Sequence, residues 1–283
     1  MPGFPAGALF LVATPIGNLG DITLRALQVL RAVDIVAAED TRHTARLLAH
    51  YGISVPTTSL HEHNEAAKAA SLVRRLQAGG RIAVVSDAGT PGISDPGFRV
   101  VRAALEAGCR VEAIPGPSAV VAALVSSGLP TDAFVFMGFP PARGSARAAW
   151  FDRLRHEERT VVFFEAPHRV RRTLEQALEA GISREGALCR ELTKVHEETL
   201  RGPLAELVTR LPARPIGEFT VVLAGDRNLP PDGPAVPPDR LYGEFCQMTE
   251  NGASRRDAIT TLARRYKLRS REVYAAIEQM RDS

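Results

Sequence analysis

Short apolar runs alternate with helical patterns over residues 1–120, and this alternation limits the possible folds more than any other feature of the sequence. Because two parallel strands need a crossover of about a dozen residues, usually a helix, the spacing predicts right-handed crossovers and a mostly parallel sheet. The predicted strands are Leu9–Ala13, Ile35–Ala38, Thr57–Leu60, Ile82–Val85 and Val111–Ile114.

The same two patterns continue after Phe134 and define a second region, separated from the first by a hinge near Val120–Pro130. The sequence therefore predicts two α/β domains, at residues 1–120 and 121–226. The elements predicted in the second region are strands at Phe134–Met137, Thr160–Phe164, Ala187–Cys189 and Thr220–Leu223, and helices at Phe151–Leu154 and Val170–Ala180.

A proline-rich linker at residues 227–240 follows, and such a segment cannot join a packed core. Residues 241–283 predict a small module of two or three short helices, the first over Leu241–Glu250. Ser254 and Ser270 are good N-caps for the next two helices.

Composition favours a soluble globular protein, with 45% hydrophobic and 24% charged residues. No apolar run approaches the ~18 residues of a membrane-spanning helix, and the N-terminus lacks the pattern of a secretory signal. Cys109, Cys189 and Cys246 are too far apart to form a disulfide framework or a metal cluster. We therefore expect a cytoplasmic protein without a membrane partner.

The net charge of +3 is modest, but the basic residues are clustered. Seven of them lie between Arg255 and Arg271 against one acid, Asp257, and eight arginines lie between Arg143 and Arg172 against four acids. Clusters of this kind are typical of proteins with a polyanionic partner. Solvated helix faces give the same pattern in an arginine-rich chain, so charge alone leaves both interpretations open.

Four loops rich in glycine, proline and polar residues follow predicted strands, and in open parallel sheets ligands bind beyond the carboxyl ends of the strands. Each loop by itself is also consistent with ordinary turn chemistry, but four within 120 residues favour a binding site. The loops are Thr14–Asp21, Glu39–Arg42, Ser86–Gly97 and Ile114–Ala119.

The glycines of the third loop let the backbone approach a ligand closely, and Asp87 offers a carboxylate. The first loop lacks both the Gly-x-Gly-x-x-Gly spacing and a P-loop lysine, which argues against a nucleotide polyphosphate. His61-Glu62-His63 lacks a metal-ligand spacing and is interpreted as a surface loop, so no metal is predicted.

The order of six segments resembles the tetrapyrrole-methylase-like (class III) methyltransferase superfamily, and within it the family of small-subunit ribosomal RNA cytidine 2′-O-methyltransferases. The resemblance covers Leu9 to Gly225, and the basic C-terminal module is similar to that family's helical extension. The segments are TPIGNLGD (14–21), AEDTR (38–42), SDAGTPGISDPG (86–97), IPGPSA (114–119), FFEAPHR (163–169) and RELTKVHEE (190–198).

This resemblance implies an α/β fold in which S-adenosylmethionine binds in a cleft between two α/β domains. It implies methyl transfer to the ribose 2′-hydroxyl of a cytidine in small-subunit (16S) ribosomal RNA, by a homodimer that does not bind DNA. The residues expected near the cofactor are Thr14, Pro15, Ile16, Asp87, Gly89, Thr90, Ser118, Ala119 and Phe164.

A ribose hydroxyl is a poor nucleophile at neutral pH, so a general base or a nearby cation is expected to assist. We predict Lys194 and Glu165 in this catalytic role; the structural alternatives are a Glu165–Arg169 ion pair and a Lys194 that bridges acids. Contacts to the RNA backbone are predicted for Arg143, Arg147, Arg169, Arg255, Arg256, Arg264, Arg265, Lys267, Arg269 and Arg271.

Two other functions remain open. A methyltransferase acting on a tetrapyrrole precursor has no need for the basic tail. A non-catalytic RNA-binding assembly factor has no need for intact glycine loops.

Overall fold

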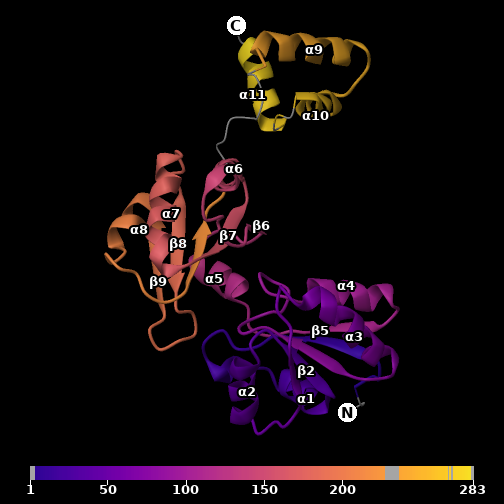
Figure 1. Cartoon of the computed structure of the whole chain (residues 1–283). Coiled ribbons are helices and arrows are strands. Elements are labelled where there is room, and N and C mark those ends of the chain that lie inside the picture. The colour runs from indigo at the N-terminus through magenta and orange to yellow at the C-terminus, as the bar shows by residue number, and fades with distance from the viewer. Residues whose placement is uncertain (1–3, 227–235, 267, 269, 282–283) are drawn as a thin grey trace. The chain divides into compact units, whose positions relative to one another are not determined.

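The β-branched runs near the N-terminus form a five-stranded, fully parallel sheet in the order β3-β2-β4-β1-β5 (Figure 1). The computed structural model describes residues 4–226, 236–266, 268 and 270–281. The central strands are buried on both faces, as their continuous apolar sequences require. The strands are β1 (Ala8–Val12), β2 (Ile35–Ala38), β3 (Thr57–Ser59), β4 (Ile82–Val85) and β5 (Arg110–Ile114).

Helices cover this sheet on both faces because successive side chains of each strand point in opposite directions. Phe10 of β1 therefore joins one apolar cluster, with Val29 and Leu30, while its neighbour Leu9 joins another, with Leu72. The helical elements are η1 (Leu19–Asp21, a 3₁₀ turn), α1 (Leu24–Ala32), α2 (Thr41–His50), α3 (Glu65–Gln77) and α4 (Phe98–Glu106).

The second sheet has the order β6-β7-β10-β8-β9, and only the β6–β7 pair is parallel. Strand β9 and helix α8 were not predicted, and α5 occupies most of the predicted hinge. The elements are α5 (Ala119–Ser127), β6 (Phe134–Phe136), α6 (Gly144–Arg155), β7 (Thr160–Glu165), α7 (Pro167–Glu179), β8 (Glu185–Arg190), β9 (Glu198–Pro203), α8 (Leu204–Arg210) and β10 (Phe219–Leu223).

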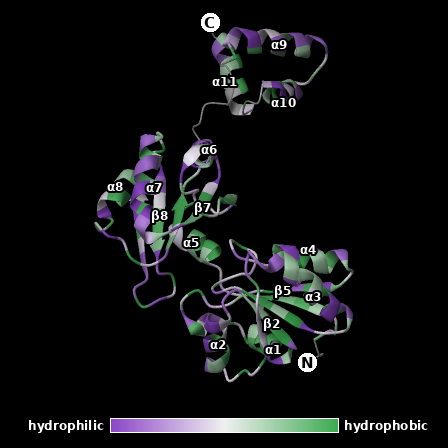
Figure 2. Ribbon diagram, in the orientation of Figure 1, coloured by the Kyte–Doolittle hydropathy of each residue, from purple (hydrophilic) through white to green (hydrophobic). Residues whose placement is uncertain are grey.

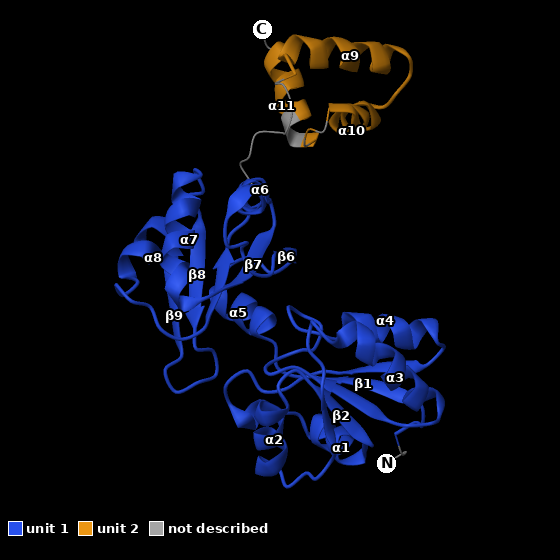
Figure 3. Ribbon diagram, in the orientation of Figure 1, with its two compact units in different colours: residues 1–226 blue, residues 227–283 orange. Residues whose placement is uncertain are grey.

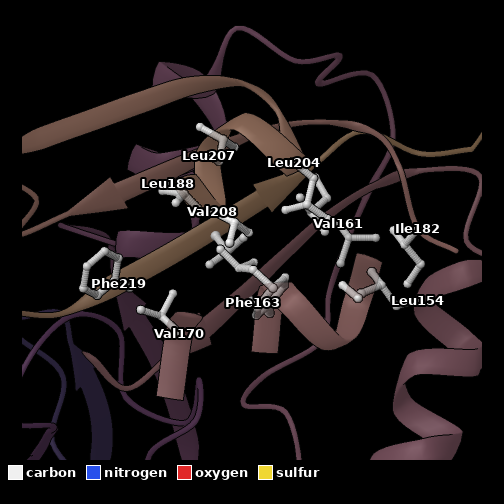
Figure 4. Packing of buried hydrophobic residues seen from close by; sticks show 14 of the residues in the cluster. Leu154, Val161, Phe163, Val170, Ile182, Leu188, Leu204, Leu207, Val208 and Phe219 are labelled. Carbon is white, nitrogen blue, oxygen red and sulfur yellow. The ribbon is translucent and has the colours of Figure 1, made fainter. Parts of the chain in front are cut away.

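Large apolar side chains fill the space between this sheet and helices α6, α7 and α8. Figure 4 shows Phe163 of β7 and Leu188 of β8 beside Val170 of α7 and Leu207 of α8. In Figure 2 strand β7 is mainly green, whereas much of α7 is purple, as expected for a helix with one buried face. The second sheet therefore has a core of its own, which fixes the positions of the loops at the ends of its strands.

The chain divides into two compact units, residues 1–226 and 227–283 (Figure 3). The second unit is built from α9 (Pro238–Glu250), α10 (Arg255–Tyr266) and α11 (Ser270–Arg281), which enclose a small core around Phe245, Leu262 and Ile277. Helix α9 begins inside the segment predicted as linker, because proline is well suited to the first position of a helix. None of the helices described is long and apolar enough to cross a membrane.

Glu65, at the start of α3, anchors the end of the Ser86–Gly97 loop. Its side chain is buried, with 5% of the residue exposed, and Oε1 accepts hydrogen bonds from the backbone N–H groups of Gly97, Arg99 and Val100 at 3.0, 2.8 and 3.3 Å. These donors belong to the first turn of α4, where N–H groups have no partner within the helix. A carboxylate at this end of a helix is also favoured by the helix dipole.

We expect Glu65→Ala to lower the free energy of unfolding by about 3 kcal/mol, because hydrogen bonds to charged groups are strong and their loss leaves buried N–H groups unpaired. Glu65→Gln should lose less, since its amide oxygen still accepts. Urea unfolding measures both, with the exposed Glu62→Ala as control. Equal losses for Glu65→Ala and Glu62→Ala would contradict the anchoring role.

Candidate active site

A cavity of about 440 Å³ lies where the carboxyl ends of β4 and β5 face the edge of the second sheet. Its size is that of a pocket for a small organic ligand. Its walls come from the loop after β4, the start of α5, the end of β7, the end of β8 and the start of β10. The fold thus places residues of all four predicted loops around one cavity.

Main-chain pairing holds the floor of this cavity together. Thr14 and Gly89 form an isolated antiparallel bridge, with N–H···O distances of 2.9 and 3.0 Å, and the Thr14 hydroxyl donates to the Ser86 carbonyl at 3.1 Å. Gly89 has φ of +81°, a conformation that favours glycine, and a Cβ there would lie 3.4 Å from Ile16 Cγ2. The Thr90 hydroxyl ties the same loop to the Pro117 carbonyl.

A loop of each sheet meets the other at Gly17, in the loop after β1. A Cβ on Gly17 would lie 2.4 Å from Lys194 Cγ and 3.1 Å from the Leu192 carbonyl oxygen. Glycine therefore permits the loop after β8 to pack against the loop after β1. This contact sets one border of the cavity, because Leu192 itself belongs to the lining.

Most residues predicted to bind the cofactor line this cavity. Thr14 and Pro15 instead line an adjoining cavity of about 170 Å³, which shares Asp87 with the larger one. The predicted residues in the larger lining are Ile16, Asp87, Gly89, Thr90, Ser118, Ala119 and Phe164.

Glu165, a predicted catalytic residue, lines the cavity at the end of β7. Its side chain is fully buried, and it accepts hydrogen bonds from the Thr173 hydroxyl at 2.6 Å and from the Ala166 N–H at 2.9 Å. Arg169 Nε lies 3.3 Å from Oε1. The carboxylate is therefore held in one orientation, and the ion pair with Arg169 considered from the sequence is present.

Lys194, the other predicted catalytic residue, is not part of the lining. Its ammonium donates to Glu191 Oε1 at 2.9 Å and to Glu218 Oε2 at 3.1 Å. Burial by itself would lower the pKa of Lys194, but the hydrogen bonds to the two carboxylates outweigh it and raise the pKa. The group therefore stays protonated and bridges two acids, the structural alternative weighed from the sequence.

The lining carries five carboxylates, and the described residues that form it include no lysine, arginine or histidine. Two acids, Asp95 and Glu218, were not singled out from the sequence. Asp95 lies in the Ser86–Gly97 loop, whose composition predicts ligand binding. The sequence around Glu218 contains no motif that would have indicated a binding site. The five are Glu39, Asp87, Asp95, Glu165 and Glu218.

Burial and neighbouring acids alter the proton affinity of two of them. Burial raises the pKa of Asp95 to about 6, helped by the negative charges of Glu39 and Asp87 and opposed by a hydrogen bond with Ser86. Burial also raises the pKa of Glu39. Perturbed carboxylates in a cavity are typical of functional sites. Within the described part of the chain, no group of three or more side chains has the arrangement of a metal site.

An open groove of about 630 Å³ runs between α6 and α7. Arg143, Arg155 and Arg172 line it at exposed positions. Arg147 lies beneath them, with 9% of the residue exposed, and its guanidinium donates to Gln176, Thr173 and the Pro141 carbonyl.

The predicted phosphate contacts of Arg147 and Arg169 are thus opposed by the structure. Arg169 pairs with Glu165 and donates to the carbonyls of Pro140 and Pro141. Arg147 is buried, and the half-buried Arg169 is engaged by acceptors of the protein itself.

The arginines predicted to bind RNA in the second unit fall into two groups. Arg255 pairs with Glu278 at 3.0 Å and Arg265 with Glu244 at 2.6 Å, so both link helices of the module. Arg256 and Arg264 are exposed, and no ion pair within 4.0 Å is found for either among the described residues. Lys267 and Arg269 lie outside the described residues, as does the side chain of Arg271.

Comparisons with known proteins agree with this geometry. The sequence profile of the tetrapyrrole (corrin/porphyrin) methylases matches residues 8–208. "Ribosomal RNA small subunit methyltransferase I" of Synechocystis sp. is 46% identical over 271 residues, which cover 95% of this chain and 96% of that protein. The protein of the same name from Escherichia coli O157:H7 is 47% identical over 233 residues, 81% of this chain and 82% of that protein.

Two solved structures share the fold. Uroporphyrin-III-C-methyltransferase from Thermus thermophilus aligns with a TM-score of 0.54 at 21% identity, covering 76% of this chain and 94% of that one. Diphthine synthase aligns with a TM-score of 0.59 at 17% identity, covering 77% of this chain and 90% of that one. At these identities the likeness concerns the fold alone.

Proposed function

This chain belongs to the tetrapyrrole (corrin/porphyrin) methylase family, and we propose that within this family it methylates the 2′-hydroxyl of a cytidine in small-subunit ribosomal RNA. It is a methyltransferase that uses S-adenosylmethionine. The observation that carries the proposal is the match of 46% identity over nearly the whole chain to a ribosomal RNA small subunit methyltransferase.

The residues around the large cavity fit such a methyl donor. S-adenosylmethionine, when bound, supplies a methyl group on a positively charged sulfur atom. A cavity of about 440 Å³ suits a ligand of this size, and its wholly acidic set of charged residues suits a cationic ligand better than a phosphate. Gly89 belongs to the lining, and its positive φ keeps the loop after β4 in the conformation that forms this wall.

We assign the donor-binding role to the predicted residues that line this cavity and to Thr14 as a support of its floor. Glu165 is the group proposed to accept the proton of the ribose hydroxyl, because its carboxylate is held in one orientation at the end of β7, directly behind the lining of the cavity. Lys194 is proposed to act as a positioning residue, since its protonated ammonium fixes Glu191 and Glu218 and cannot serve as a base.

RNA contacts are proposed on two surfaces. The first is the groove between α6 and α7, where Arg143 is exposed. The second is the face of α10 that carries Arg256 and Arg264, which are eight residues apart and so share one side of the helix. Phosphate contacts at both surfaces would fix the register of the RNA, while specificity comes from its folded shape.

A tetrapyrrole precursor is the less favoured acceptor. The relative named for ribosomal RNA spans 95% of this chain, whereas the uroporphyrin methyltransferase structure covers 76%. The additional length in the first alignment fits the basic second unit, which a small-molecule enzyme does not need. A non-catalytic role is disfavoured because most of the residues predicted to bind the methyl donor line one cavity.

The test is methyl transfer from labelled S-adenosylmethionine to small ribosomal subunits from cells that lack this protein, followed by nucleoside analysis by mass spectrometry. We expect label in 2′-O-methylcytidine, and none in subunits from cells that contain the protein, which are already methylated. Label in a tetrapyrrole precursor but never in RNA would contradict the proposal.

Two further properties belong to the same proposal. The protein works in the cytoplasm, where ribosomal subunits are its substrate, and it acts as a homodimer without binding DNA. Sedimentation of the purified chain tests the homodimer.

A further inference from the structure

The charges around the large cavity are unevenly neutralised. Glu165 and Glu218 have cations outside the lining, Arg169 at 3.3 Å and Lys194 at 3.1 Å, and Asp87 lies 3.9 Å from His43. For Glu39 and Asp95 no ion pair within 4.0 Å is found among the described residues.

These two unpaired acids converge from different strands. Glu39 follows β2, and its Oε2 faces the Asp87 N–H at 3.5 Å, while Asp87 Oδ1 accepts the Asp40 N–H at 3.0 Å. Asp95 lies farther along the loop after β4 and interacts with both Glu39 and Asp87 through their charges. Three carboxylates therefore share one wall of the cavity, and for two of them, Glu39 and Asp95, no ion pair is found among the described residues.

Such an arrangement is unfavourable when the cavity holds only water, and the repulsion adds to the effect of burial on Asp95. Burial, Glu39 and Asp87 together raise the pKa of Asp95 to about 6. A ligand with net positive charge would offset the repulsion, whereas a neutral ligand of the same shape would not. The wall thus responds to ligand charge independently of ligand shape.

We propose that Asp95, together with Glu39, makes the cavity select its ligand by charge, so that it favours the cationic methyl donor over the neutral demethylated product. The inference rests on the proposed function only through the identity of the donor. S-adenosylmethionine carries one net positive charge and S-adenosylhomocysteine carries none, although the two differ by a single methyl group. Loss of that charge weakens the attraction to the wall and promotes product release.

Calorimetric titration of the full chain with each ligand tests this inference. Because the donor prefers ionised Asp95, its binding near pH 6 should release a fraction of a proton, seen as a dependence of the binding heat on the buffer. S-adenosylhomocysteine should release less. The preference for the donor should increase as the pH rises through the pKa of Asp95.

Asp95→Asn should abolish the extra proton release and reduce the donor-to-product affinity ratio by about fivefold to tenfold. The same variant should raise the melting temperature of the ligand-free protein at neutral pH. The folded pKa of Asp95 lies above its unfolded value, so its favourable contribution exists at low pH and is lost as the pH rises through about 6. Asparagine does not ionise, so the folded protein no longer loses this stability as the pH rises.

The matched control is Asp152→Asn, an exposed change outside the cavity that should leave the ratio unchanged. Glu39→Gln should also reduce the donor-to-product affinity ratio. This variant provides the test if Asp95→Asn does not fold. The difference between wild type and Asp95→Asn gives the proton release that comes from Asp95 alone. The other titratable groups near the wall and across the cavity are unchanged in this comparison; they are Glu39, Asp40, His43, Glu65, Asp87, Glu165 and Glu218.

An unchanged ratio in both variants, or equal proton release with the two ligands, would overturn charge selection. Failure of wild type to bind either ligand would instead refute the donor site itself. The two failures are therefore distinguishable.

Discussion

Replacing Glu165 with glutamine is expected to lower kcat for RNA methylation by about 10²- to 10³-fold, the range typical of a lost general base. Glutamine keeps the shape of the side chain and still accepts from Thr173, but it cannot take a proton. The dissociation constant of the methyl donor should change by less than about threefold, because the residue acts on the acceptor. Single-turnover assays with saturating RNA measure the first quantity, and calorimetry measures the second.

The dependence of kcat on pH distinguishes a general base at Glu165 from a residue with a purely structural role. A carboxylate that accepts a proton gives log kcat an acid limb, and Glu165→Gln should remove that limb. Glu175→Gln, a change at a half-buried position on the same helix as Arg169 and outside the cavity, is the control. Breaking a buried ion pair is itself destabilising, so melting temperatures must accompany the kinetics. A stable Glu165→Gln protein with nearly normal kcat would exclude Glu165 as the base.

The double variant Arg256→Glu, Arg264→Glu is expected to weaken binding to small-subunit RNA by about tenfold to a hundredfold at physiological salt. Both side chains are exposed on α10, and removing an arginine that pairs with a phosphate should reduce the slope of log affinity against log salt by about 0.7 to 0.9. Filter binding at several salt concentrations measures both effects. Donor affinity and the melting temperature should stay near those of the wild type.

The control for this prediction is Arg74→Glu, Arg75→Glu, which makes the same change of charge at exposed positions on α3. An equal loss of RNA binding in both double variants would indicate that only net charge matters. Arg255 and Arg265 are unsuitable for the test, because each forms an ion pair that links two helices of the module.

Sequence patterns were sufficient where local chemistry decides the structure. Two of the predicted strands, Ile35–Ala38 and Ile82–Val85, have the predicted bounds, because short β-branched runs between turns leave little choice. The loop at Ser86–Gly97 was found through its glycines. Strand β9 was missed, since Glu198–Pro203 alternates weakly and contains glycine and proline, and its place at the sheet edge depends on pairing with β8.

Where distant residues decide the environment, the sequence was less informative. Arg147 resembles any surface arginine of a basic cluster, yet Gln176 and Thr173 hold it in the interior. Glu218 gains its place in the cavity only because β10 lies between β7 and β8. Lys194 was chosen for its chemistry, whereas its protonation depends on Glu191 and on Glu218, which lies 24 residues away in the chain.

The bridge between Thr14 and Gly89 has a dynamic consequence. Each residue donates its amide hydrogen to the carbonyl of the other, so neither bond is easily broken without the other. Local opening of this part of the cavity therefore requires a concerted fluctuation of the segments after β1 and β4, more costly than the fraying of an ordinary loop. The part of the cavity next to this bridge therefore moves together with the first sheet. Changes of cavity shape that accompany ligand binding are expected in the parts of the lining that side chains form.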